Sequence, residues 1–270
     1  MKNIVKLFCV MTLLVFTQFA NAQEDTILDD PTLVYDSIQT ESPSRHIIKL
    51  NVPSLFVGTL SFQYEFFPVN FMSISLGYKF TPKRGMVFED KVIDLIEDSS
   101  GIDNLESTGE RFFRDFEFSG NAITPEVRFY LGQGYGKGFY LGPFLRFDNY
   151  DFSSNYNFTT FEDQYLIDFE GKYKGFGYGL NIGTQFTIGK HFTIDTSLGP
   201  YFSNVKIDFN SVSDYNLSDA EMEQLREELS DFELPNGDTE ITLTNNSARM
   251  KLTSDNFFNL RFNLGIGFRF

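Results

Sequence analysis

The sequence has no tryptophan and one cysteine, Cys9, among its 270 residues. Cys9 lies in a segment that we expect to be removed, so the mature chain can form no disulfide and no cysteine-bound metal site. Only two histidines are present, which argues further against a transition-metal centre. From these absences we expect no metal and no cofactor.

Basic residues are also scarce, because 22 Lys and Arg stand against 37 Asp and Glu, for a net charge of −15. Residues 1–22 hold two of the lysines and no acidic residue, so the chain without them carries −17. Nucleic-acid binding depends on Lys and Arg that neutralise phosphates, so nucleic acid is excluded as an expected partner. The 33 Phe and 13 Tyr in turn argue against a disordered chain.

Apolar runs long enough for a membrane-spanning helix are missing. The run from Leu7 to Val15 follows two lysines and precedes Ala20-Asn21-Ala22, which is the pattern of a signal peptide cleaved after Ala22; an uncleaved anchor is the alternative. Residues 23–44 are polar and acidic, which predicts a flexible periplasmic leader before a barrel domain at 45–270. The mature chain is therefore either soluble or crosses a membrane as strands.

From His46 onward, apolar and polar residues alternate with the period of two that is typical of strands. The alternation is clearest at the end of the chain, where every second residue from Phe258 to Phe270 is apolar. Further segments alternate at 59–66, 72–80, 123–131, 139–148, 175–188 and 192–202. The alternation slips after Phe202, which suggests a bulge there.

An eighth, shorter strand is expected at Ile47–Val52, although Pro53 could instead kink one long strand. Link lengths favour eight strands. Short links alternate with long ones, the short at Pro68–Asn70, Gly132–Gly138 and Gly189–Lys190 and the long at 81–116, 153–169 and 209–255. With eight strands the long loops share one side, and both termini and the short turns share the other. The sequence thus predicts an all-β, eight-stranded antiparallel up-and-down transmembrane β-barrel with long acidic outer loops.

A soluble lipocalin-like lipid-binding barrel would bury the apolar faces, whereas an outer-membrane barrel turns them to lipid. We favour the membrane barrel because the apolar faces are rich in Phe and Leu and nearly free of charge. The opposite face of 175–183 is nearly all glycine, which suits a crowded lumen.

Several motifs carry a resemblance over residues 46–270. They are Lys49–Pro53, Gly58–Ser61 with Glu65, Thr124–Tyr130, Gly138–Gly142 and Asn263–Phe270. With them the chain resembles the small OmpA/OmpX-type outer-membrane barrels, and most closely an uncharacterised Bacteroidota barrel family of unknown function. The resemblance implies fold and location but no activity. It also implies that Leu264, Ile266, Phe268 and Phe270 form the end signal for the barrel-assembly machinery, a transient partner.

Charged residues on the polar faces are expected to point into the lumen, together with Lys79 and Arg269. Small barrels are filled by side chains, and buried charges collect opposite partners. We therefore predict a hydrogen-bonded ionic plug; a gated path or proton-linked site is the alternative. Its members are Lys49, Glu65, Glu126, Arg128, Arg146, Asp148, Asp195 and Arg261.

The predicted loops hold most of the acid, since 209–255 contains eleven Asp and Glu against three Lys and Arg. Within it, Ser218 and Glu221 form a capping-box pattern that predicts a short amphipathic helix through Leu229, and a second helix is expected at 91–98. These loops could bind an extracellular partner, bridge divalent cations to anionic lipid, or simply be solvated.

The expected function is structural or surface-interacting and non-enzymatic. A transporter of small solutes or hydrophobic molecules is the alternative, and would need an open lumen or a lateral gap between strands. A lipid-modifying enzyme would depend on His46 or His191, and neither has Ser and Asp partners at persuasive spacing.

Overall fold

The computed structural model describes residues 44–85, 116–132, 134–160, 164–211, 216–230, 234 and 236–270. All of them belong to Pro43–Phe270, the second of the two units into which the chain divides. The predicted signal peptide, the leader up to residue 43 and the predicted helix at 91–98 lie outside the described residues.

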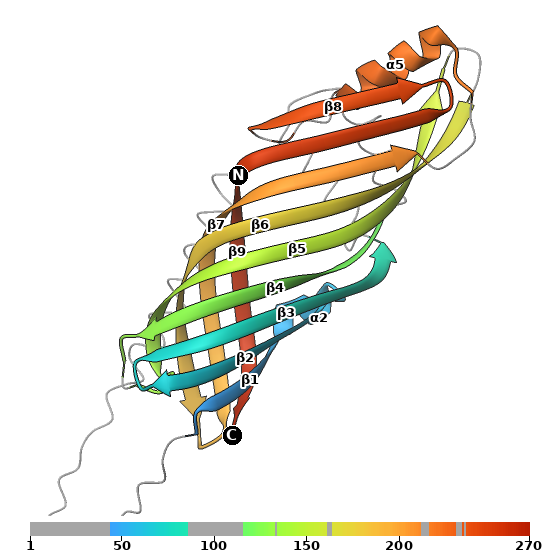
Figure 1. The fold of residues 1–270 in the computed structure, drawn as a ribbon. Coiled ribbons are helices and arrows are strands. Elements are labelled where there is room, and N and C mark those ends of the chain that lie inside the picture. Colours follow the sequence, from blue (N-terminus) through green and yellow to red (C-terminus); the bar gives the residue numbers. More distant parts are fainter. Residues whose placement is uncertain are drawn as a thin grey trace, which may run out of the picture. The chain divides into compact units, whose positions relative to one another are not determined.

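Eight strands form a closed antiparallel barrel in which neighbours along the chain are neighbours in the sheet (Figure 1). Pairing between the first strand and the last closes the ring, and β8 pairs only with β9. The all-β, up-and-down architecture predicted from the alternation is confirmed. The strands of the described residues are β1 (His46–Asn51), β2 (Leu60–Val69), β3 (Met72–Gly85), β4 (Glu117–Tyr130), β5 (Gly138–Thr159), β6 (Gln164–Ile188), β7 (Phe192–Ser211), β8 (Gly237–Thr244) and β9 (Ser247–Arg269).

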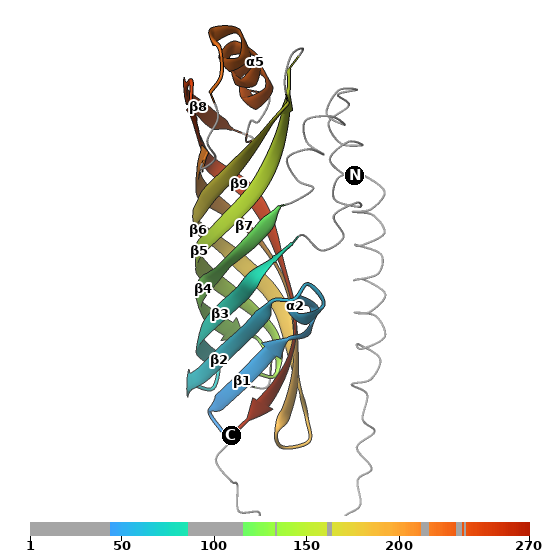
Figure 2. The same ribbon diagram turned by 90° about the vertical axis from the view of Figure 1, so that its right-hand side faces the viewer.

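β1 is a separate strand, as the link lengths predict, because it pairs with β2 on one side and β9 on the other. It ends one residue earlier than expected, at Asn51, and the connection is a short helix, α2 (Val52–Phe56), in place of a simple turn. The Asn51 side chain accepts a hydrogen bond from the Ser54 N–H at 3.3 Å, which caps the helix. Figure 2 shows α2 at the ends of β1 and β2.

Two of the predicted long loops are largely regular structure, which corrects the sequence analysis. The segment 153–169 continues β5 to Thr159 and resumes as β6 at Gln164. The segment 209–255 contains the end of β7, the helix α5 (Asp219–Ser230) and the β8–β9 hairpin. The strands β5, β6, β7 and β9 therefore extend beyond the barrel and carry β8 and α5, forming what we call the cap (Figure 1).

The two faces of the strands exchange polarity where the barrel gives way to the cap. On β6 within the barrel, Phe176 and Ile182 face outward, 42% and 54% exposed, while Asn181 is fully buried inside. Further up the same strand, the inward positions are held by Ile167 and Phe169, both buried. Odd-numbered positions of β6 stay on the inner face along the whole strand. The strand therefore keeps its register, and only the surroundings of its inner face change, from polar in the barrel to apolar in the cap.

This exchange corrects the expected bulge in β7. Val205 and Phe209 share the parity of the inward barrel residues and are buried in the cap, so β7 keeps its phase after Phe202. The irregularity lies on β9, where Ser203 pairs with Phe257 but Val205 pairs with Ser254. Asn256, at φ 58°, takes the left-handed conformation there, so the extra residue belongs to β9.

α5 closes the inner face of the cap and creates a second apolar core. None of the described helices is long and apolar enough to cross a membrane. The buried members of the cap core are Tyr156, Phe158, Ile167, Phe169, Phe209, Leu217, Leu225, Leu229, Ala248, Met250 and Leu252.

Leu225→Ala should loosen α5 and leave the barrel intact, because Leu225 is fully buried in the cap core. The expected local loss is about 2–5 kcal/mol, read by hydrogen exchange of the α5 amides. Glu223→Ala, an exposed change on the same helix, is the control. Equal protection of α5 in the two variants, or matching loss in β2 to β4, would contradict a separate cap core.

Candidate functional site

Four buried charges from different strands meet in the lower lumen. Lys49 Nζ of β1 lies 2.6 Å from Glu65 Oε2 of β2 and 2.7 Å from Asp195 Oδ2 of β7. Arg128 Nη1 of β4 reaches the same Asp195 oxygen at 2.6 Å. Each side chain is at most 2% exposed. Alternation places these charges inward, and closure of the barrel brings together strands that are more than a hundred residues apart in sequence.

The ion pairs continue through Glu126 to Arg261 on β9. Arg128 Nε lies 2.8 Å from Glu126 Oε1, and Arg261 Nη1 lies 3.2 Å from Glu126 Oε2. Glu126 and Arg128 are two residues apart on β4, so both point inward. Three cations and three anions are thereby joined into one balanced set, which we call the ionic layer: Lys49, Glu65, Glu126, Arg128, Asp195 and Arg261.

Neutral side chains complete the hydrogen bonds of the ionic layer. Tyr130 donates to Glu65 Oε1 at 2.6 Å, and Tyr140 donates to Asp195 Oδ1 at 2.8 Å. Arg128 donates to Gln63 Oε1 at 3.1 Å, and Lys49 donates to Gln185. The Arg128 guanidinium also lies 4.3 Å from the Tyr140 ring centroid. Sequence alternation put these four partners on the polar face but did not show which charge each would meet.

Two predicted members stand outside the ionic layer. Arg146 and Asp148 form their own two-bond pair, at 2.8 and 2.7 Å. Arg269 also points inward, but it donates to the backbone carbonyl oxygens of Ser44 and Tyr135. Lys79 makes no ion pair with any described residue, and its Nζ lies 6.0 Å from the Tyr150 ring centroid.

Close approach inside the barrel accounts for the glycines of β6. A Cβ at Gly183 would lie 2.5 Å from Tyr140 Cζ, and one at Gly179 would lie 2.4 Å from Tyr201 Cβ. Larger residues would displace the tyrosines, so glycine makes room for the side chains that fill the lumen. The crowded lumen expected from the glycine run is present, with tyrosines as the nearest neighbours.

Both histidines lie at the short-turn end of the barrel. His46 Nδ1 lies 2.6 Å from the Tyr64 hydroxyl, and His191 Nδ1 lies 3.1 Å from the Arg269 carbonyl oxygen. The His191 ring stacks on Phe268 at 5.4 Å. Within the described part of the chain, neither imidazole meets a carboxylate, so the geometry offers no acid–base pair there.

The predicted capping box at the start of α5 is formed. Glu221 Oε2 accepts hydrogen bonds from the Ser218 N–H and hydroxyl, both at 2.8 Å. The backbone bond from Ser218 is the largest cause that holds the pKa of Glu221 below its usual value. The reciprocal bond from the Glu221 N–H to Ser218 Oγ is 3.4 Å. The two side chains therefore fix Ser218 as the capping residue at the start of α5.

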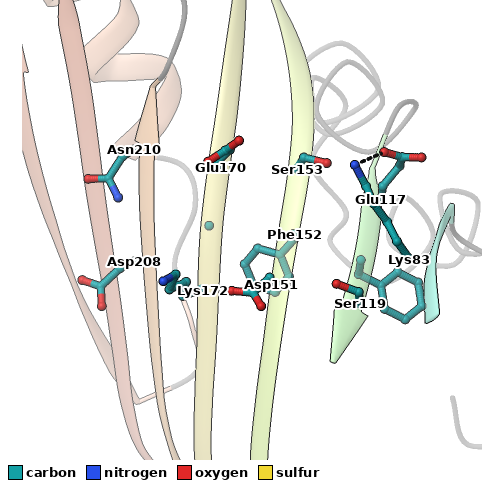
Figure 3. A pocket seen from close by; sticks show the side chains of 12 residues that line it. Lys83, Glu117, Ser119, Asp151, Phe152, Ser153, Glu170, Lys172, Asp208 and Asn210 are labelled. Carbon is teal, nitrogen blue, oxygen red and sulfur yellow. Dashed lines mark ion pairs between the residues drawn. The ribbon is translucent and has the colours of Figure 1, made fainter. Parts of the chain in front are cut away.

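An open pocket of about 390 Å³ crosses the outer face of the sheet from β3 to β7 (Figure 3). Its side chains lie in two rows set by the strand register, with Lys83 paired to Glu117 at 2.9 Å. The rows are Ser119–Asp151–Lys172–Asp208 and Glu117–Ser153–Glu170–Asn210. Four carboxylates and two lysines line the pocket, so this surface is acidic. No described group of three or more His, Asp or Glu could hold a metal ion.

Comparison with known proteins gives a match to one family model, and the solved structures that resemble the chain include two outer-membrane barrels. The family described as a protein of unknown function (DUF3575) matches residues 107–228, which include β4 to β7 and most of α5. No curated protein matches the sequence.

The N-terminal β-barrel domain of Pseudomonas aeruginosa OprF is 11% identical, with 84% of this chain and 98% of that chain covered, at a TM-score of 0.26. Acinetobacter baumannii CarO is 13% identical over the same shares, at a TM-score of 0.35. These superpositions are loose, and the fold assignment therefore rests on the strand pairing itself.

Arg128→Met should destabilise the barrel by about 3–5 kcal/mol, because two buried carboxylates lose a shared cation. Urea unfolding in detergent micelles would measure the loss. Arg261→Met is the matched control, since that side chain is 17% exposed and contacts one carboxylate, and it should cost less. Adding Asp195→Asn to Arg128→Met should recover part of the stability. Equal losses for the two arginine variants would contradict a layer centred on Arg128.

Proposed function

We propose that this chain is a non-enzymatic β-barrel of the bacterial outer membrane, with a lumen closed by the ionic layer and a cap that meets partners outside the cell. The observation that carries the proposal is the exchange of polarity along the long strands. One stretch suits lipid outside and charge inside, and the next suits water outside and an apolar core inside.

The membrane placement is supported by the outward faces of the barrel strands. Large apolar side chains are exposed there on every strand, among them Tyr78, Leu145, Leu180, Ile266 and Phe268. Soluble monomers rarely expose a continuous apolar surface of this extent. A charge at the bilayer midplane costs about 2–4 kcal/mol, which explains why charged residues avoid this band. A lipocalin-like barrel would have the opposite arrangement, with its apolar faces inside.

The orientation is supported by the ends of the strands. His46 begins β1 and Arg269 ends β9 at the end with the short turns, and the cap stands at the other end. Outer-membrane barrels have short periplasmic turns and long outer loops. The predicted signal peptide, the periplasmic leader and the terminal signal for the barrel-assembly machinery agree with this orientation. So does the resemblance to a Bacteroidota barrel family.

The cap is the part best suited to interaction. Its own apolar core holds it in shape, while its outer face presents the acidic pocket of two polar rows. The exposed side of α5 adds Glu223 and Glu227. A partner with basic and hydrogen-bonding groups would complement this surface. A transporter of hydrophobic molecules is the second candidate, favoured by a cavity between β2 and β9 that residues of both strands line.

Planar-bilayer recording tests the closed lumen. The wild-type barrel should give no steady ion current, because the ionic layer fills the lower lumen. The double variant Arg128→Ala with Asp195→Ala removes one cation and one anion, which keeps the charge balance while opening space, and it should conduct. Arg146→Ala with Asp148→Ala removes a pair outside the layer and should stay closed.

Folding of each double variant is checked first by its mobility on unheated gels. A steady current through the wild type would sink the proposal of a closed lumen. Equal currents through the two double variants would show that the ionic layer is not the barrier.

A further inference from the structure

The barrel wall is interrupted between β2 and β9. β1 is short, and its last pair with β9 joins Asn51 to Gly265. On the same edge of β9, the pairing with β8 starts only at Ser254, opposite Gly237 of β8. Among the described strands, none pairs with that edge between these two points. Backbone N–H and C=O groups without hydrogen-bond partners are unfavourable in lipid. We therefore expect polar groups to satisfy this edge of β9.

A cavity of about 410 Å³ fills the interruption, and residues from both faces of the sheet line it. Lys79, Arg146 and Arg261 reach it from the lumen side. Phe62 and Phe262 belong to the outward face of β2 and β9, 49% and 42% exposed. Since the two groups point to opposite sides of the wall, a cavity lined by both passes through the wall. The volume is in the range of small-molecule sites.

The turn containing α2 closes the lower side of the cavity. Pro53, Ser54 and Val57 line it. The Asn51 amide donates to Asn263 Oδ1 at 2.7 Å, which ties β1 to β9 below the opening. Arg84 Nη1 donates to the Val57 carbonyl oxygen at 2.6 Å, which ties the turn to β3. These two hydrogen bonds fix the position of the turn at the edge of the opening.

The charged lining is entirely cationic: Lys49, Lys79, Arg146 and Arg261. The carboxylates that pair with three of them, on Glu65, Glu126, Asp148 and Asp195, do not line the cavity. Lys79 has no ion-pair partner among the described residues. Charge without a partner in a partly desolvated cavity favours an anionic ligand.

We infer that this cavity binds an anionic single-chain amphipath, of the kind represented by a fatty acid. The carboxylate of the ligand lies at Lys79, near Arg146 and Arg261. Its acyl chain leaves the barrel between two groups of side chains, the aromatic residues of β2 and β3 on one side and Leu260 and Phe262 of β9 on the other. The ionic layer below blocks passage to the short-turn end. The site thus exchanges its ligand with the outer leaflet or the exterior, and this holds whether or not the cap binds a partner.

Photo-crosslinking tests the site. The full chain in neutral detergent is exposed to a diazirine derivative of laurate, and the labelled peptides are mapped by mass spectrometry. Labels should concentrate on 60–80 and 258–263. Laurate should compete, and dodecanol, which has the chain without the charge, should not.

The variant Lys79→Gln should weaken competition by laurate about tenfold, the value of one charge-assisted hydrogen bond. Lys79→Arg should keep it, and Lys137→Gln, an exposed change at the opposite end of the barrel, is the control. Labels spread evenly around the apolar band, or Lys79→Gln behaving as wild type, would overturn the site. Competition by inorganic phosphate as strong as that by laurate would replace the amphipath with a free anion.

Discussion

A side chain on a β-strand keeps its face unless a bulge intervenes, and the rest of the structure depends on this constraint. Four strands run the whole way from the barrel into the cap, so their inward positions must serve two environments in turn. Near Asn181 the inward positions meet buried charge, and near Ile167 they meet the apolar side of α5. Only β9 resets its phase, by one extra residue at Asn256. The level along the strands at which the two faces exchange polarity therefore divides one sheet into two regions, the barrel and the cap.

The ionic layer follows from the same constraint. Barrel closure brings six inward charges to one level, and burial leaves them no solvent, so each must find an opposite partner. The result is balanced, with Arg128 and Asp195 at its centre. The same closure leaves a weak point where β1 is too short to cover β9. The cationic cavity occurs at that point, and it borders the layer through Lys49 and Arg261.

Much of this arrangement could be predicted from the sequence, because period two fixes which residues share a face. Loop parity predicts the strand count, and alternation predicts which charged residues share the inner face. Alternation does not show how far along the barrel each inward residue lies. Arg146 and Asp148 share the inner face with the layer but lie nearer the cap on β5, and they pair with each other.

The cap differs from the sequence prediction for a related reason. Its inner apolar residues, such as Tyr156 and Val205, alternate in the same way as the outward apolar residues of the barrel, but on the opposite face. The sequence pattern there predicts a loop or a bulge, because a sequence does not show where the surroundings of a strand change. The capping box at Ser218 was readable because its partners are three residues apart, whereas the gap beside β9 depends on contacts across the closed barrel.

Labelling of single cysteines on intact cells tests the exchange of polarity most directly, since the only native cysteine lies in the predicted signal peptide. Single variants Lys172→Cys and Glu223→Cys in the cap, Leu180→Cys in the apolar band and Lys190→Cys at the short-turn end would be treated with a membrane-impermeant maleimide. The account predicts labelling of the two cap positions only, with Lys190→Cys labelled after the outer membrane is opened. Labelling of Leu180→Cys on intact cells, or of Lys190→Cys ahead of the cap positions, would contradict it.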